Sequence, residues 1–332
     1  MTLFLTVFLV LYVWHAMGIT IGYHRLLSHR SFSCPKFVEY FWVLAGYLVW
    51  QGSPIWWATI HRTHHKFTDT ALDPHSPDFG WFNAQYGWLL REKYADHVSP
   101  ALQSKDLLKD PVYRFLEQDG NLHRGHAIGF ATCVLFRLII LACFGWVPVL
   151  ASIAAWVAVW QIPLMLNVVC HIQRLGYRTY ATDEGSVNVW WVGILAMGEG
   201  WHNNHHASPG SARTGIQPHE FDASWLVIRL MRKLGLVTRI NEATHEQLSQ
   251  KYRVVSVSQT DFAITDAAVT EFGATATGAI EVDVAEAAAT TTGAEQSAPS
   301  VDPSGSIAVA STPLPNHRAN VSLAKKEFSK AS

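Results

Sequence analysis

Four apolar stretches stand out in residues 1–253, and their lengths predict which parts of the chain cross a membrane. Residues 2–23 contain no Asp, Glu, Lys or Arg and are long enough to span the hydrocarbon core as a helix. A cleavable secretory signal is the alternative, but the stretch lacks a basic start and a small-residue cleavage site. Residues 37–50 are short for a crossing and contain Glu39, which favours an interfacial or partly buried helix.

The other two apolar stretches, residues 127–149 and 150–169, meet near Pro148 and predict a helical hairpin that crosses the membrane twice. Arg137 lies inside the first of them. A charged side chain is costly in lipid, so we expect Arg137 to face protein.

Lys and Arg are unevenly distributed over the connecting segments. Residues 1–23 and the hairpin turn at 145–152 have none, whereas the loops at 24–36 and 61–124 and the segment after 169 are rich in them. The positive-inside rule therefore places these loops together on the cytoplasmic face and the hairpin turn outside.

The composition agrees with a membrane protein, because 49% of the residues are hydrophobic and only 15% are charged. A net charge of −1 provides no excess positive field for nucleic acid, so no nucleic-acid partner is expected. Four widely spaced cysteines without a CxxC pair disfavour a disulfide scaffold and a thiolate zinc module.

The composition changes near residue 253, and small and polar residues predict a disordered, low-complexity tail over 254–332. A regulatory or docking tail is the alternative.

Seventeen histidines are the second unusual feature of the composition, and eight of them fall into three clusters. The clusters are His24 and His29; His61, His64 and His65; and His202, His205 and His206. Residues at i, i+3 and i+4 share one face of a helix, so each HxxHH cluster is expected to converge its three rings. Positions i and i+5 lie about 140° apart on an α-helix, so the first pair needs a helix end or a turn.

Eight imidazoles exceed the ligands of one metal, and two metals with four or five nitrogens each fit the number. Imidazole alone leaves iron, zinc, copper and nickel open. Asp69, Asp73 and Glu199 are close enough in sequence to orient the ligand rings, with solvated surface acids as the alternative. His75 stays undecided, and the remaining histidines are interpreted as ordinary polar residues. A shared site requires all three clusters on one side of the membrane. If residues 37–50 do not cross, the first two clusters stay on the same side, and a hairpin that crosses twice returns the third cluster to that side.

With these clusters in place, the chain resembles the integral-membrane acyl (delta-9, stearoyl-CoA-like) fatty acid desaturases over nearly all of residues 10–240. The resemblance rests on Gly18-Ile19-Thr20, His24-Arg25-Leu26, Ser28-His29-Arg30, Gln51-Gly52, Trp57, the second cluster, Asp73-Pro74-His75, Gly87-Trp88, Gly198-Glu199-Gly200-Trp201-His202-Asn203 and the third cluster. It implies an all-α, integral-membrane helical bundle with a cytoplasmic, His-rich di-iron cap.

The resemblance also implies a ligand set for the two irons. The implied ligands are His24, His29, His61, His64, His65, His171, His202, His205 and His206, with Asn167 near the metal through water. His171 enters only through the resemblance, at the end of an N-x-x-x-H pattern. Gln51 and Trp57 match positions near the bend of an acyl tunnel. Trp56, Trp190 and Trp201 are weaker lining candidates that could instead be interface anchors or packing residues.

The implied reaction uses O2 and two external electrons to introduce a cis double bond, expected at carbon 9, into a long-chain saturated acyl substrate. Thr59-Ile60 replaces the Arg-Asp pair that binds CoA in animal-type relatives, which leaves acyl-CoA, acyl-lipid and carrier-protein thioesters open. No fused electron carrier is visible, so a separate ferredoxin or cytochrome b5-type donor with a reductase is expected. The family usually has two helices before the first cluster, so this chain either starts late or begins outside the cytoplasm.

Two alternatives remain at this point. A His-rich di-iron membrane hydroxylase or ketolase would have a similar metal centre and differ in how the substrate is held. A non-catalytic metal transporter or sensor would place histidines deep in its spanning segments, where only His15 lies in this sequence.

Overall fold

The computed structural model describes residues 1–91 and 93–255. In this part of the chain the structure is mostly helical, with one two-stranded antiparallel ribbon that pairs β1 (Phe32–Ser33) with β2 (Arg239–Ile240). The α-helices are α1 (Thr2–Met17), α2 (Lys36–Tyr47), α3 (Pro54–Phe67), α4 (Trp81–Gln85), α5 (Pro100–Gln103), α6 (Pro111–Glu117), α7 (Leu122–Phe144), α8 (Trp146–Val169), α9 (Trp190–Leu195), α10 (His202–Ala207), α11 (Ala223–Lys233) and α12 (His245–Lys251). The other helical segments are the π-helix η1 (Gly18–Ser28) and the 3₁₀ turns η2 (Pro77–Phe79), η3 (Gly87–Leu90), η4 (Leu107–Lys109), η5 (Gln118–Gly120) and η6 (Gln173–Leu175).

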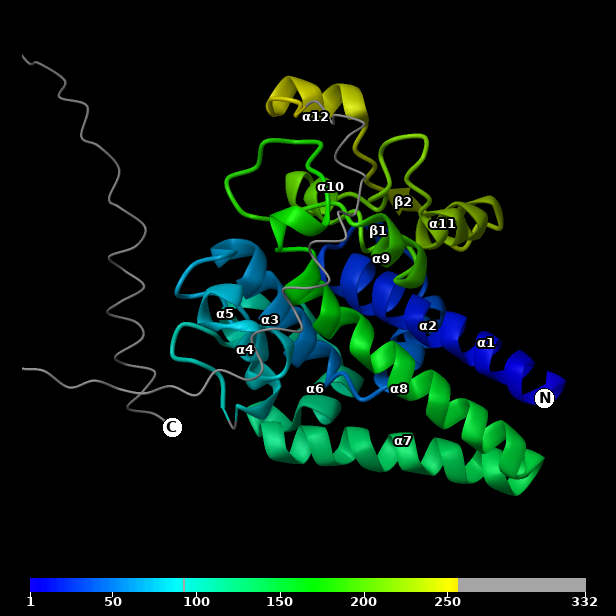
Figure 1. The fold of residues 1–332 in the computed structure, drawn as a ribbon. Coiled ribbons are helices and arrows are strands. Elements are labelled where there is room, and N and C mark those ends of the chain that lie inside the picture. Colours follow the sequence, from blue (N-terminus) through cyan, green and yellow to red (C-terminus); the bar gives the residue numbers. More distant parts are fainter. Residues whose placement is uncertain (92, 256–332) are drawn as a thin grey trace, which may run out of the picture. The chain divides into compact units, whose positions relative to one another are not determined.

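Three helices are long and apolar enough to cross a membrane: Thr2–Ser28, which joins α1 to η1, then α7 and α8. Figure 1 shows α1 and α8 running beside each other, with α7 along α8, α2 beside α1, and α3 to α6 gathered at the end away from the N-terminus. These lengths are compatible with membrane association. The first span reaches further than the expected residues 2–23 and includes His24 as well as His15.

The hairpin between α7 and α8 differs in detail from the sequence prediction. The chain turns at Gly145, whose φ of +81° suits glycine, and not at Pro148. Pro148 instead lies in the first turn of α8, where the missing N–H costs no helical hydrogen bond. Both ends of α7 and the start of α8 therefore lie four to five residues closer to the N-terminus than expected, while α8 ends at Val169 as expected.

Arg137 on α7 faces protein, as we expected from the free-energy cost of placing a charged side chain in lipid. Its side chain is 6% exposed, donates to the carbonyl oxygens of Leu48 and Cys133, and lies 4.4 Å from the ring centre of Trp156. Backbone carbonyls and an aromatic face thus replace the water that a guanidinium would otherwise need.

The short helix α2 packs against the π-helical end of the first span. A Cβ added at Gly18 would lie 2.2 Å from the backbone nitrogen of Gly46, so glycine is required for this close approach. Glu39 on α2 is buried and accepts hydrogen bonds from Lys36 Nζ at 2.6 Å and Tyr113 Oη at 2.7 Å. Among the described residues α2 is not one of the spanning helices, as its length predicted.

The tail predicted over 254–332 lies, from residue 256 on, outside the described residues. Its first two residues belong to the folded part. Val254 forms an isolated bridge with Tyr180, and the N–H of Val255 donates to the carbonyl of Thr179 at 3.0 Å. A truncation that removes only the tail should therefore keep both valines.

Candidate metal centre

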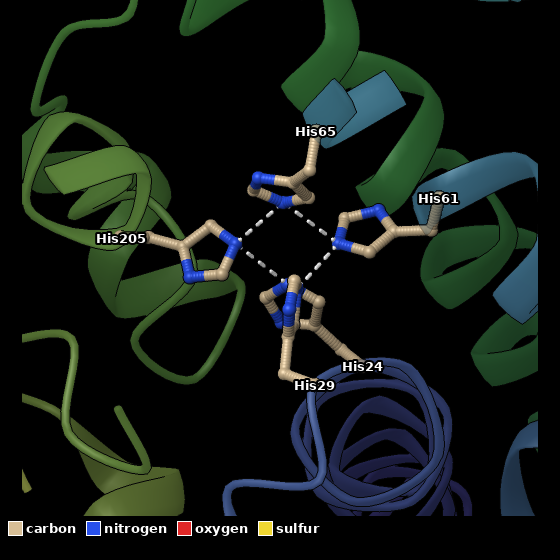
Figure 2. Close-up of side chains that lie close together, drawn as sticks. All are labelled: His24, His29, His61, His65 and His205. Atoms are coloured by element: carbon tan, nitrogen blue, oxygen red, sulfur yellow. Dashed lines mark hydrogen bonds between the residues drawn. The ribbon is translucent and has the colours of Figure 1, made fainter. Parts of the chain in front are cut away.

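Five buried or half-buried histidines from three distant segments converge on one point, as Figure 2 shows. They are His24, His29, His61, His65 and His205. One ring nitrogen from each lies within 4.8 Å of the others. The Nε2 atom of His61 is 2.8 Å from that of His29 and 3.1 Å from that of His65. The Nε2 atom of His205 is 3.0 Å from that of His24 and 2.9 Å from that of His65. We call this set the five-histidine group.

Four further histidines form a second convergence, the four-histidine group. Its members are His64, His171, His202 and His206. The Nε2 atom of His202 lies 3.2 Å from that of His171 and 3.1 Å from that of His206. The ring centre of His64 is 5.2 Å from that of His206. The nine histidines implied by the resemblance are therefore all in one of the two groups, and His75 is in neither.

Each HxxHH motif divides its rings between the two groups, which corrects the expectation that all three would converge. On a helix the residue at i+4 is rotated by about +40° from residue i and the residue at i+3 by about −60°, so i+3 points to the other side. On α3, His61 and His65 face the five-histidine group and His64 faces the four-histidine group. On α10, His202 and His206 face the four-histidine group and His205 crosses to the other.

The pair His24 and His29 is brought together by the wide helix η1. The N–H of His29 donates to the carbonyl of His24 at 3.1 Å, which is the i→i+5 bond of a π-helix. A π-helix has more residues per turn than an α-helix, so residues five apart lie on nearly the same face of it. The pair also sits at the helix end, because His29 is the residue that follows Ser28, so the sequence expectation is confirmed.

Three carboxylates lie against the Nδ1 atoms of histidines in the two groups. Glu199 contacts Nδ1 of His24. Asp73 is 2.9 Å from Nδ1 of His64 and Asp69 is 3.0 Å from Nδ1 of His171. A carboxylate at Nδ1 keeps the proton there and leaves the Nε2 lone pair free to point inward.

One carboxylate close to the groups was missed by sequence reasoning. Glu184 lies 3.9 Å from Nδ1 of His206, although it is far from every histidine cluster in sequence. No local sequence pattern around Glu184 predicts this contact.

The electrostatics keep most of these rings neutral. Burial first, and neighbouring histidines second, hold the pKa values of six rings well below the usual range: His29, His61, His65, His202, His205 and His206. Burial alone would raise the pKa values of the three carboxylates, but the facing rings, with Arg25 beside Glu199, hold them below their ordinary values. Neutral imidazoles backed by ionised carboxylates are the protonation states that bind a metal.

The converging nitrogens fit two bound cations better than a set of mutual hydrogen bonds. A neutral imidazole has one N–H and one lone pair. In a neutral ring whose Nδ1 donates to a carboxylate, the arrangement open to His24, His64 and His171, Nε2 is an acceptor only. Packing several such nitrogens together places lone pairs against one another, and a cation between them would remove that repulsion. The donor sets of five and four nitrogens therefore suit one metal each.

His75, left undecided by the sequence, is buried beside this centre. Its ring centre is 4.4 Å from that of His64 and 5.3 Å from that of Trp88, and its Nδ1 atom is 3.6 Å from Asp73. Burial lowers the pKa of His75 to about 3, so the ring is neutral. Its ligand atoms lie close to those of His64 and Asp73, but it belongs to neither group of converging nitrogens.

The predicted substrate residues differ in their relation to the centre. Trp57, 7% exposed, stacks on His61 with ring centres 4.8 Å apart, and so borders the five-histidine group. Gln51 is buried and its Nε2 atom donates to the carbonyl of Trp160 at 2.8 Å, while its Oε1 atom has no hydrogen-bond partner. Asn167 is half-buried near the end of α8, four residues before His171.

The weaker candidates have ordinary structural surroundings. Trp56 stacks on Trp88 with ring centres 5.2 Å apart. Trp201 is buried and donates to the carbonyl of Phe221 at 2.9 Å. Trp190 is 51% exposed at the start of α9.

A buried arginine that sequence reasoning did not single out ties the first cluster to the third. Arg25 is 1% exposed and donates to Glu199 Oε1 from both Nε and Nη2, at 3.1 and 3.0 Å. Its Nη1 atom is 3.0 Å from Asp222. Because Glu199 contacts His24, Arg25 fixes the carboxylate that orients this ring.

The two asparagines of the third motif also hold its helix in place. Asn203 Oδ1 accepts from the N–H groups of Thr179 and Tyr180, both at 2.9 Å. Asn204 Nδ2 donates to Glu220 at 2.7 Å. The short helix α10 is therefore anchored by hydrogen bonds from side chains other than the converging rings.

Fold and site together define a helical protein with membrane-length helices and a buried centre of imidazole groups. The sequence model of the fatty acid desaturase family matches residues 1–229. The chain is 42% identical over 226 residues to the acyl-CoA 5-desaturase AL21 of Anemone leveillei, covering 67% of each protein. It is 39% identical over 245 residues to the sn-1 stearoyl-lipid 9-desaturase of Anabaena variabilis, covering 72% of this chain and 84% of the relative. It is 36% identical over 246 residues to the delta-9 acyl-lipid desaturase 1 of Arabidopsis thaliana, covering 73% and 77%.

The chain belongs to the fatty acid desaturase family, which confirms the resemblance drawn from its motifs. It is an oxidoreductase that desaturates fatty acyl chains.

Proposed function

We propose that this desaturase holds two irons, and with O2 and two external electrons places a cis double bond at carbon 9 of a long saturated acyl chain. The observation that carries the proposal is the pair of histidine groups, with five and four converging ring nitrogens. The stearoyl-lipid and acyl-lipid relatives named for carbon 9 support the position, although a relative named for carbon 5 is similarly close. The acyl carrier is CoA or a lipid, since relatives named for both are similar.

In this proposal the nine histidines bind the two irons. The five-histidine group, His24, His29, His61, His65 and His205, binds one iron. The four-histidine group, His64, His171, His202 and His206, binds the other, with Asn167 near this second iron through water. An iron pair supplies, when bound, the O2 chemistry needed to remove hydrogen from an unactivated methylene. Asp69, Asp73 and Glu199 hold the Nδ1 protons of their partner rings, which keeps three Nε2 lone pairs directed inward.

The protein's second task is to hold one pair of acyl carbons beside the centre in a dry environment. Trp57 is suited to this because its buried ring is stacked on a proposed ligand, His61. Gln51 is the second proposed wall residue, because the carbonyl of the following Gly52 accepts a hydrogen bond of 3.0 Å from Tyr23 Oη, and the Tyr23 ring lies 5.8 Å from that of Trp57. The unpaired Oε1 atom of Gln51 is a polar group available to a substrate.

We further propose that the protein is integral to the membrane with its histidine groups on the cytoplasmic side, where a separate ferredoxin or cytochrome b5-type protein delivers the electrons. The asymmetry of Lys and Arg supports this orientation. The three membrane-length helices support the membrane location.

The direct test is expression of the full chain in a desaturase-deficient host, with double-bond position and lipid class read by gas chromatography–mass spectrometry. We expect a new monounsaturated chain with its double bond at carbon 9, and none from a His205→Ala variant. A hydroxylated product without an alkene would instead support the hydroxylase or ketolase. Metal flux into vesicles without any O2-dependent product would support the transporter.

A Trp57→Leu variant tests the tunnel assignment. Removing the indole ring that is stacked on His61 should let the acyl chain shift, so the double-bond position or the preferred chain length should change. Trp56→Leu is the matched control, because Trp56 stacks on Trp88 instead, and its product profile should stay that of the parent. An unchanged profile in Trp57→Leu would remove Trp57 from the substrate wall.

A further inference from the structure

Helix α11 has one side buried against the first spanning helix and α2. The side chains of Trp225, Ile228 and Met231 pack in a cluster with Met17 and Ile21 of the first span and Trp42 of α2. The indole Nε1 of Trp42 lies 3.2 Å from the sulfur of Met231. The position of α11 beside the spanning helix is therefore set by a continuous apolar contact.

The outer side of α11 carries a second apolar stripe that no described residue covers. Leu226, Leu230 and Leu234 are 49%, 54% and 65% exposed, and Phe221 just before the helix is 54% exposed. Residues four apart stay within about 40° of each other on a helix, so the three leucines form one line along its length. Exposed leucines in such a line mark an interaction surface and not scattered surface residues.

Basic side chains follow this stripe along one edge. Arg229 and Lys233 are exposed at about 240° and 280° around the helix from Ala223, next to Leu226 at about 300°. Arg232, also exposed, lies farther round at about 180°. Residues 223–239 contain no Asp or Glu. The outer side of α11 is therefore apolar along one line and positively charged along the next, the pattern of a helix that lies in a membrane interface.

The apolar stripe also has an equivalent on the neighbouring helix. On α2, Phe37, Phe41 and Leu44 are 66%, 50% and 48% exposed and share one face. Because α2 and α11 pack together beside the first span, both exposed stripes belong to helices that contact a helix long and apolar enough to cross a membrane.

We propose that α11 lies on the membrane surface and binds anionic lipid, with its leucine stripe at the boundary of head groups and acyl chains and its basic edge against lipid phosphates. The proposal depends on the membrane location of the protein and not on its metals or its acyl substrate. The rival partner for a basic surface is an acidic electron-donor protein. The continuous leucine line favours lipid, because a charge-steered, transient donor contact would need little apolar surface.

Spin-label accessibility in the full-length protein tests the insertion. A nitroxide is attached at Leu230→Cys in a Cys143→Ser background, since Cys143 is exposed, and the protein is placed in nanodiscs of phosphatidylcholine and phosphatidylglycerol. We expect the label to be relaxed by O2, which concentrates in lipid, more than by a water-soluble nickel chelate. A label at Lys251→Cys on α12 should show the reverse order. A nickel-dominated label at residue 230 would overturn the proposal.

Charge reversal tests the preference for anionic lipid. The protein should melt roughly 2–4 °C higher in nanodiscs with phosphatidylglycerol than in phosphatidylcholine alone, and Arg229→Glu/Lys233→Glu should abolish the difference. Lys251→Glu/Arg253→Glu makes the same change in net charge at exposed positions elsewhere and should keep it. An equal response in both double variants, or a loss restricted to electron transfer from the donor, would contradict lipid binding.

Discussion

Replacing His64 by alanine is expected to remove iron from the four-histidine group, and replacing the adjacent His65 to remove it from the five-histidine group. The two residues are neighbours on α3, but their rings face different groups. Each variant should retain about half of the parent's iron, because the other donor set is left intact. Desaturation should be lost in both, since the proposed reaction needs both irons.

Iron content by plasma mass spectrometry and the iron spectrum of each purified variant measure this outcome. The residual spectra of His64→Ala and His65→Ala should differ, because the iron that remains has a different ligand set in each. His123→Ala, which changes an exposed histidine at the start of α7, should keep full iron and activity. Full activity in either cluster variant, or identical residual spectra, would contradict the assignment to two groups.

Replacing Arg25 by alanine should produce the largest loss of stability in the described part of the chain. It would leave Glu199 and Asp222 buried without their cationic partner. Removing one member of a buried ion pair typically costs about 3–5 kcal/mol in the free energy of unfolding. Arg25→Lys should recover only part of this, because lysine cannot donate to both carboxylates with the geometry of a guanidinium.

Thermal unfolding of the purified protein in one detergent measures the effect of the Arg25 variants. Arg30→Ala is the matched control, since Arg30 pairs with Asp106 at a half-exposed surface, where such a pair contributes about 0–1 kcal/mol. We also expect Glu199→Gln to weaken iron binding about 10–100-fold in the five-histidine group, because Glu199 orients His24. An Arg25→Ala variant as stable as Arg30→Ala would show that the buried network is not needed.

Much of this protein can be predicted from local features of its sequence. Membrane-length helices follow from the length of uncharged stretches, and the burial of Arg137 follows from the cost of a charge in lipid. The helix end at His29 follows from the five-residue spacing of the first cluster. The turn at Gly145 was misplaced because Pro148 looked like the break, although proline is tolerated in the first turn of a helix.

By itself, therefore, the sequence determined which histidines converge, because residue types that bind metals, their spacing and the family motifs can all be read along the chain. Only the tertiary structure decided how the rings divide between two groups, and that Arg25 and Glu184 support them. The division depends on the rotation of α3 and α10 about their axes, which packing sets and which the HxxHH spacing leaves open. The supporting contacts join residues that are far apart in the sequence, such as Arg25 and Glu199, which are separated by 174 positions, and no local pattern predicts a partner at that distance.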